Sequence, residues 1–344
     1  MERLRAALGS RPARRLLFAI LALAAIDRVE PAILQSLERA RYEDPGRDFR
    51  FENSDLFDLG PLVDYLREHP RGARRRVVFL GDSVTYGYTL SAAEALPARY
   101  QRLDGSAKVF NVGLNGFRPG SLFLIAKATV DCVDEVYALR VPHGTPNVQP
   151  LLSSLIPIDE DDRARFQLAR PDERERRLSQ FADHWRLYRD AYRLQAAMLG
   201  SSTRQYLYLH KGAFVRALVT RVRAEAAPEP LPGATLTIDA PMSHAMPDAA
   251  RQRRLRQEDP DLWESADLFL NRRRRIVFLH LSNHSPDMTG ADIADFNRVF
   301  APYARVLVVQ VPPALTFDST HLTADGCEAL ARALWRTRTE EGAP

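Results

Sequence analysis

Two short segments of the chain hold the residue types that together perform acyl transfer. Ser83 lies just behind the apolar run 77–80, and Asp318 and His321 stand three residues apart much later in the chain. A serine hydroxyl is a weak nucleophile, so it needs an adjacent base, and that base needs a third group to orient it. The two segments therefore predict Ser83 as nucleophile, His321 as general base and Asp318 as the carboxylate that orients the imidazole.

A simpler interpretation exists for each of these residues taken singly. A glycine, an aspartate and a serine in a row, as at 81–83, also make an ordinary turn. Asp318 is equally compatible with a turn, and His321 with an exposed position before a helix. The elements that surround these residues decide between the two interpretations.

Five runs rich in β-branched and apolar residues predict buried strands, with helical or irregular segments between them. They are 76–80, 108–112, 135–141, 276–281 and 306–311. This alternation predicts an α/β fold in which helices cover both faces of a parallel sheet. Ligands bind beyond the carboxyl ends of the strands in such sheets. Because Ser83, Asp318 and His321 are all expected near those ends, the catalytic interpretation is favoured over three unrelated turns.

Helices are expected between the strands and after the last one. Pro97 suits the first turn of a helix that runs to about residue 103, and Ser121 can cap a helix through about residue 130. Another helix is predicted over 292–300, and Thr323 is a good N-cap for the last one. The pattern breaks between the third and fourth strands, where we expect a helical insertion at about 150–270. Its proline-rich part, 225–250, is predicted to be irregular.

The first residues of the chain resemble a targeting or anchoring segment. Several arginines precede the apolar run Leu16–Ile26, which suits the hydrophobic part of a signal peptide better than a full membrane span of about 20 residues. We expect residues 1–26 to be a signal peptide or an N-terminal membrane anchor, and 27–70 a lead-in to the domain at 71–344. This predicts a periplasmic or cell-envelope protein, with membrane association through its N-terminal segment.

The composition is that of an ordinary globular protein. Apolar residues make up 45% of the chain, charged residues 27%, and the net charge is only +4. No basic stripe with interleaved aromatic residues is present, so nucleic acid is not expected as a partner. No metal-ligand spacing, phosphate-binding glycine loop or dinucleotide fingerprint occurs, so no metal site and no cofactor is predicted.

Three blocks of sequence resemble those of the SGNH (GDSL-type) hydrolase family. Val78–Gly87 (VFLGDSVTYG) resembles its first block, Asn111–Gly116 (NVGLNG) its second and Asp318–Gly326 (DSTHLTADG) its final D-x-x-H block. The resemblance covers roughly residues 74–145 and 275–335. It implies a flavodoxin-like three-layer α/β/α sandwich with a five-stranded parallel sheet. The helical insertion between strands 3 and 4 lies outside the resemblance.

The same resemblance implies an oxyanion hole. The amides of Ser83 and Gly116 would donate to the oxyanion, with Gly113 as an alternative to Gly116. The family places an asparagine after the third strand, but this chain has Val141–Asn147 (VPHGTPN) there. His143 stands at the expected position, whereas Asn147 has the expected residue type, and the sequence leaves both open. His280 and His284 flank Ser282 at the end of the fourth strand and are expected to border the same site; structural or solvent-exposed roles are favoured over substrate binding.

These features predict an exported serine esterase that hydrolyses a small-molecule, glycan or lipid ester through an acyl-enzyme, for example an O-acetylated glycan. One alternative is an O-acyltransferase that uses the same triad on an envelope polysaccharide. Another is a catalytically inactive binding module, which the departure in the third block suggests, because a fold does not guarantee a function.

Overall fold

The computed structural model describes residues 11–42, 59–68, 74–88, 90–91, 93–113, 118–140, 158–168, 235–285 and 288–340. The chain divides into two compact units. One consists of residues 1–47 and 170–203, and the other of residues 48–169 and 204–344. The predicted insertion falls largely outside the described residues.

A mixed, mostly parallel sheet forms the centre of the second unit, with strand order β2-β1-β3-β5-β6-β4. The parallel strands are β1 (Arg75–Gly81), β2 (Ala107–Gly113), β3 (Glu135–Leu139), β5 (Arg275–Leu281) and β6 (Ala304–Gln310). They lie where the sequence predicts strands, and the α/β class is confirmed. The side chains of β2 and β3 are buried along their whole length, as expected of parallel strands covered on both faces.

The predicted count of five strands is wrong, because a sixth strand adds to the edge of the sheet. This strand, β4 (Thr237–Asp239), pairs antiparallel with β6, with Ile238 opposite Val309. It falls within the segment 225–250 that the prolines predict to be irregular. Three residues with a largely exposed pattern carry no apolar run, so the strand forms because the edge of β6 offers backbone partners and not because of its own sequence.

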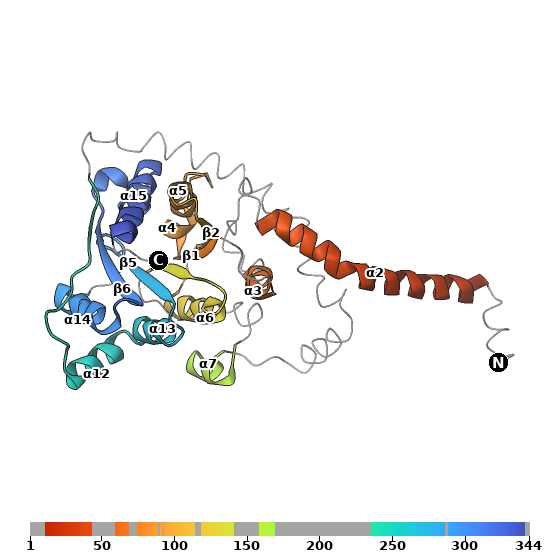
Figure 1. Cartoon of the computed structure of the whole chain (residues 1–344), viewed down its shortest axis with the longest axis horizontal. Helices are drawn as coiled ribbons and strands as arrows, with labels where there is room; N and C mark the ends of the chain where they lie inside the picture. The colour runs from red at the N-terminus through yellow and green to blue at the C-terminus, as the bar shows by residue number, and fades with distance from the viewer. Residues whose placement is uncertain are drawn as a thin grey trace. The chain divides into compact units, whose positions relative to one another are not determined.

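Two groups of helices cover the sheet. On one side, α5 (Leu96–Leu103) packs against α15 (Ala324–Glu340) and against β2. On the other, α13 (Pro260–Asn271) contacts α6 (Pro119–Thr129), β5 and β6, and α14 (Gly290–Phe300) contacts β6. Figure 1 shows the two groups on opposite sides of the strands. The helix α13 lies within the range assigned to the insertion, yet it belongs to the layer that covers the sheet.

The other helices among the described residues of this unit are shorter or lie further from the sheet. They are α3 (Leu59–Glu68), α4 (Ser83–Tyr86), α7 (Glu160–Arg165), α12 (Ala249–Glu258) and the 3-10 helix η4 (Pro313–Leu315). The helix α3 contacts α6, and α12 contacts α13. Of these, α4 is the one that positions a candidate catalytic residue.

A capping threonine and a proline explain where two of the helices begin. Thr323 accepts a hydrogen bond at Oγ1 from the Gly326 amide, at 3.1 Å, and this confirms it as the N-cap of α15. The helix α6 begins at Pro119, two residues before the expected cap Ser121, which is instead buried inside the helix. Proline at the first helical position is favoured because its missing amide would have no helical partner there.

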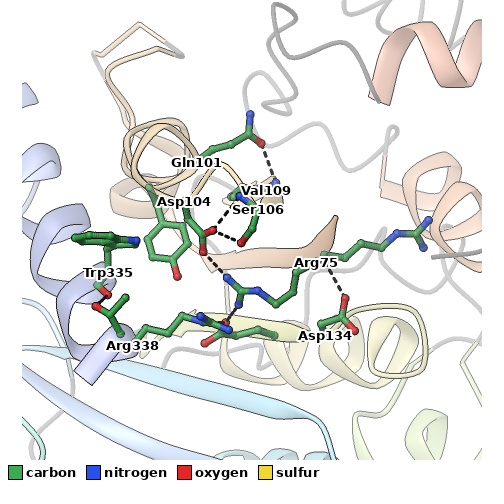
Figure 2. A network of polar contacts seen from close by, with 12 residues as sticks. Arg75, Gln101, Asp104, Ser106, Val109, Asp134, Trp335 and Arg338 are labelled. Carbon is green, nitrogen blue, oxygen red and sulfur yellow. Dashed lines mark hydrogen bonds and ion pairs between the residues drawn. The ribbon is translucent and has the colours of Figure 1, made fainter. Parts of the chain in front are cut away.

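A cluster of ion pairs joins the elements at the amino ends of the parallel strands. Glu135, whose side chain is 2% exposed, pairs with Arg75, with Arg275 at 3.2 Å and with Arg338 of α15 at 2.9 Å. Arg75 also pairs with Asp104, and Figure 2 shows this pair with Arg338 nearby. A buried carboxylate is costly unless it is paired, so these arginines stabilise the start of three strands. This is the end of the sheet opposite Ser83.

The described part of the first unit is the long helix α2 (Arg11–Tyr42). It continues through the boundary at residue 26 that separates the expected signal or anchor from the lead-in 27–70. Large apolar side chains on its first half are exposed, among them Phe18 at 76% and Leu21 at 59%. Among the described residues, no helix combines the length and hydropathy that a membrane span requires.

Candidate active site

Ser83 sits on a sharp turn between β1 and α4. The strand ends at Gly81, which has a φ of 158°, and Asp82 follows as the N-cap of α4. A side chain at Gly81 would meet Thr85 at 2.2 Å and Leu139 at 2.8 Å, so only glycine fits. Ser83 is then the first residue of α4, where its amide has no acceptor within the helix. The turn thus places a hydroxyl and an amide of one residue at the carboxyl end of β1.

The end of β2 holds the backbone of α4 in place. A Cβ at Gly113 would lie 2.2 Å from the Tyr86 nitrogen, so β2 and α4 approach each other closely only because residue 113 is glycine. Asn111 donates from Nδ2 to the Tyr86 carbonyl at 3.4 Å and accepts from the Gly113 amide at 2.9 Å. Because the Gly113 amide is already used in this way, Gly113 is a packing residue here and not a free oxyanion donor.

The segment after β6 forms a loop that presents His321. It follows η4 and is closed by an isolated antiparallel bridge between Thr316 and Leu322. Within the loop, Asp318 Oδ1 accepts hydrogen bonds from the amides of Thr320, at 3.2 Å, and His321, at 2.8 Å. Ser319 has a φ of 63°, which turns the chain back on itself. The three-residue spacing of Asp318 and His321 therefore produces a tight turn stabilised by its own carboxylate.

The structure brings together all three predicted residues of the triad. His321 Nε2 lies 2.8 Å from Ser83 Oγ, and His321 Nδ1 lies 2.8 Å from Asp318 Oδ2. A carboxylate only accepts hydrogen bonds, so His321 donates from Nδ1 and its Nε2 lone pair faces the serine hydroxyl. This is the tautomer in which histidine can take a proton from the serine.

The surroundings of the triad favour an ionised carboxylate and a fixed imidazole. Burial raises the pKa of Asp318, but hydrogen bonds from the amide and ring of His321 and from the Thr320 amide outweigh it, so the pKa is lowered from 3.8. The His321 ring stacks on Phe317, at 5.7 Å between centroids and 8° between planes, and also contacts Tyr88 at 5.3 Å. Two aromatic rings thus limit the orientations that the imidazole can take.

The other expected oxyanion donors, Gly116, His143 and Asn147, lie outside the described residues. Within the described part of the chain, the Ser83 amide is the member of the predicted oxyanion hole whose position is known.

Two histidines, one in β5 and one in the loop after it, take part in polar networks near the site. His284 Nε2 lies 2.6 Å from Asp82 Oδ2, directly beside the nucleophile. His280 Nδ1 lies 2.8 Å from the guanidinium of Arg140, which also binds Asp259 at 2.7 Å. The sequence indicated only that His280 and His284 border the site; their partners were missed, because Asp82 and His284 are 202 residues apart and no local pattern links them.

No group of three or more histidine, cysteine or acidic side chains among the described residues is arranged to hold a metal ion. No model of a known protein family matches the chain, and no curated protein matches it significantly. An assignment of function therefore depends on the geometry of the site.

Proposed function

We propose that the protein is a serine esterase of the SGNH type. The observation that carries the proposal is the continuous hydrogen-bond chain from Ser83 Oγ through the His321 ring to Asp318, with both distances at 2.8 Å. Nucleophile, base and orienting carboxylate in this order are the arrangement that serine hydrolases share on unrelated folds.

The chemistry follows from the positions of these groups. Ser83 Oγ attacks the ester carbonyl carbon while His321 Nε2 takes the hydroxyl proton, and the carbonyl oxygen becomes an oxyanion that the Ser83 amide can bind. The intermediate collapses, the bond to the alcohol oxygen breaks, and His321 returns the proton to the departing alcohol. Water then attacks the acyl-serine with His321 again as base, which releases the carboxylic acid and restores Ser83. A general base of this kind contributes about 10²–10⁴-fold.

The order of the strands supports the family assignment. Counted along the chain, the five parallel strands lie in the order 2-1-3-4-5, which is the flavodoxin-like order. We propose that they form the three-layer core of an SGNH domain, to which β4 adds an edge. In that arrangement the amide of Gly116 and the side chain of His143 or Asn147 would complete the oxyanion hole.

The N-terminal segment supports a location at a membrane surface. The exposed apolar side chains of α2 follow arginines at positions 11, 14 and 15, and a basic segment beside an apolar one suits an anionic membrane surface. We propose that the protein is exported and acts on an O-acetylated glycan or lipid of the cell envelope. Co-sedimentation of the full chain with anionic vesicles tests the membrane association. The wild type should sediment with the vesicles, and a Phe18→Glu, Leu21→Glu double variant should not. Equal recovery of the two proteins would refute membrane association through α2.

A fluorophosphonate probe tests the esterase proposal directly, because it reacts only with an activated serine. The wild type should be labelled and Ser83→Ala should not. Equal labelling of the two proteins, or no labelling of a folded wild type, would overturn the proposal. Comparison of the products with and without a polysaccharide acceptor then separates hydrolysis from transfer to a sugar hydroxyl, since both reactions share the acyl-enzyme.

A further inference from the structure

The loop after β5 forms hydrogen bonds to four other segments at the candidate site. Four consecutive residues of this loop, Ser282 to Ser285, each form a side-chain hydrogen bond to a different segment. The partners are the Val311 amide for Ser282 at 3.4 Å, the Ser319 carbonyl for Asn283 at 2.6 Å, Asp82 Oδ2 for His284 at 2.6 Å and the Arg140 carbonyl for Ser285 at 2.9 Å. Four consecutive side chains thus reach the exit of β6, the His321 loop, the nucleophile turn and the end of β3.

Of these contacts, the one to Asp82 bears most directly on the nucleophile. Asp82 Oδ1 accepts the Val84 amide at 3.0 Å and so begins α4, whereas Oδ2 binds His284 Nε2. Because a carboxylate only accepts, His284 is the donor. The helix α4 has only four residues, which is too short to be stable alone. The orientation of the Asp82 carboxylate therefore fixes the first turn of α4, and with it the hydroxyl and the amide of Ser83.

The neighbouring residue of the loop acts on the other half of the triad. Asn283 donates from Nδ2 to the carbonyl of Ser319, the residue with positive φ between Asp318 and His321. A serine in this conformation is strained, and the conformation persists only where contacts with its surroundings fix it. The hydrogen bond from Asn283 stabilises this turn, and the turn sets the direction of the His321 ring.

Together these contacts close a ring around the Ser83–His321 hydrogen bond. Three hydrogen bonds form this ring: Asp82 to His284, Asn283 to Ser319, and His321 to Ser83. The chain itself supplies the other links, because the residues joined at each step lie within two positions of each other in the sequence. We propose that His284 is a positioning residue of the triad, which acts through Asp82 to keep the Ser83 hydroxyl within reach of His321, and that Asn283 does the same from the side of His321.

This inference rests on the proposed function, because positioning matters only if Ser83 reacts. It also differs from a purely structural role. A side chain that merely stabilises the fold changes the fraction of folded protein but not the reactivity of each folded molecule. A positioning residue changes kcat and the rate of acylation in protein that is fully folded, since a misplacement of about 1 Å can cost about 10²-fold in rate.

Matched substitutions in the full chain separate these roles. His284→Leu removes the donor, whereas His284→Gln retains an N–H near the place of Nε2. Asn283→Asp keeps the shape of the side chain but replaces the donor by an acceptor that faces the Ser319 carbonyl. His244→Ala, at an exposed position, is the control. The readouts are the second-order rate of fluorophosphonate labelling of Ser83, kcat and KM for a p-nitrophenyl ester, and thermal unfolding.

We expect His284→Leu and Asn283→Asp to slow labelling and lower kcat about 10- to 100-fold, with little change in KM, and His284→Gln to recover most of the loss. The positioning role is refuted if folded His284→Leu and folded Asn283→Asp are labelled at the wild-type rate. That result leaves the esterase proposal intact, because the wild type is labelled. If His284→Leu does not fold, Asn283→Asp tests the same ring of contacts from the side of His321 and still decides. Failure of a folded wild type to be labelled would refute the esterase proposal itself.

Discussion

His321 Nε2 lies 2.8 Å from Ser83 Oγ although 238 residues of chain separate the two side chains. Ser83 follows the second strand of the sheet as counted from the β2 edge, and His321 follows the fifth strand from that edge. The contact therefore forms only when β3 and β5 lie between them in register, and the candidate site depends on the whole parallel sheet. A change that shifts these four strands relative to one another would therefore separate Ser83 from His321 even if it touched neither residue.

Asp318→Asn should abolish most of the activity while leaving the fold intact. The asparagine amide can donate to His321 Nδ1, which favours the tautomer whose Nε2 carries a proton and cannot accept one from Ser83. We expect kcat for a p-nitrophenyl ester to fall by up to about 10⁴-fold, with the melting temperature nearly unchanged. Asp325→Asn, an exposed acidic residue in the first turn of α15, is the control. Equal kcat in the two variants would contradict the role assigned to Asp318.

Stability should depend on the ionisation of Asp318 in a defined pH range. The hydrogen bonds of its turn lower the pKa of this carboxyl in the folded protein below 3.8. A lowered folded pKa means that the ionised form stabilises the fold above the unfolded pKa, and that this contribution is lost as the pH falls through the folded value. The side chain is 36% exposed, so the effect should stay below about 1 kcal/mol.

Urea unfolding of the wild type and of Asp318→Asn at a series of pH values measures this contribution. The wild type should be the more stable near neutral pH, and the gap should close as the pH falls below 3.8. A gap that is constant over the series would show that the carboxylate charge does not contribute.

The elements that carry the triad were predictable because local patterns encode them. Apolar runs marked the five parallel strands, and the three-residue spacing of Asp318 and His321 reports a turn that closes on itself. The partnership of His284 with Asp82 was not predictable, because it depends on how two loops meet at one end of the sheet. The strand β4 was missed for a similar reason: its three residues follow the edge of β6 and have no pattern of their own. The boundary expected at residue 26 rests on the end of the apolar run Leu16–Ile26, whereas the helix α2 continues without a break to Tyr42.

Gly113 should tolerate no side chain, because a Cβ there would clash with the backbone of α4, which cannot move aside as a side chain can. Its Cβ would lie 2.2 Å from the Tyr86 nitrogen and 2.6 Å from the Tyr86 Cα. Gly113→Ala must therefore push α4 away from β2, which overpacks the region at a cost of about 1–3 kcal/mol and displaces Ser83. Gly105→Ala is the matched control, since nothing lies within 4 Å of a Cβ there. Fluorophosphonate labelling and thermal unfolding of both variants test this; labelling of folded Gly113→Ala at the wild-type rate would show that α4 can shift without moving the nucleophile.

Loss of Glu135 should destabilise the protein without slowing the chemistry. Its carboxylate is 2% exposed and lies among Arg75, Arg275 and Arg338 at the end of the sheet opposite Ser83. Glu135→Ala leaves these guanidinium groups without their shared anion, and breaking such a buried cluster costs about 3–5 kcal/mol. The melting temperature should fall strongly, whereas kcat per folded molecule should match that of the wild type. The exposed Glu340 of α15 provides the control Glu340→Ala, which should melt as the wild type does. A lower kcat per folded molecule in Glu135→Ala would contradict this prediction. It would show that the ion pairs at the amino ends of β1, β3 and β5 affect the geometry of the triad at the other end.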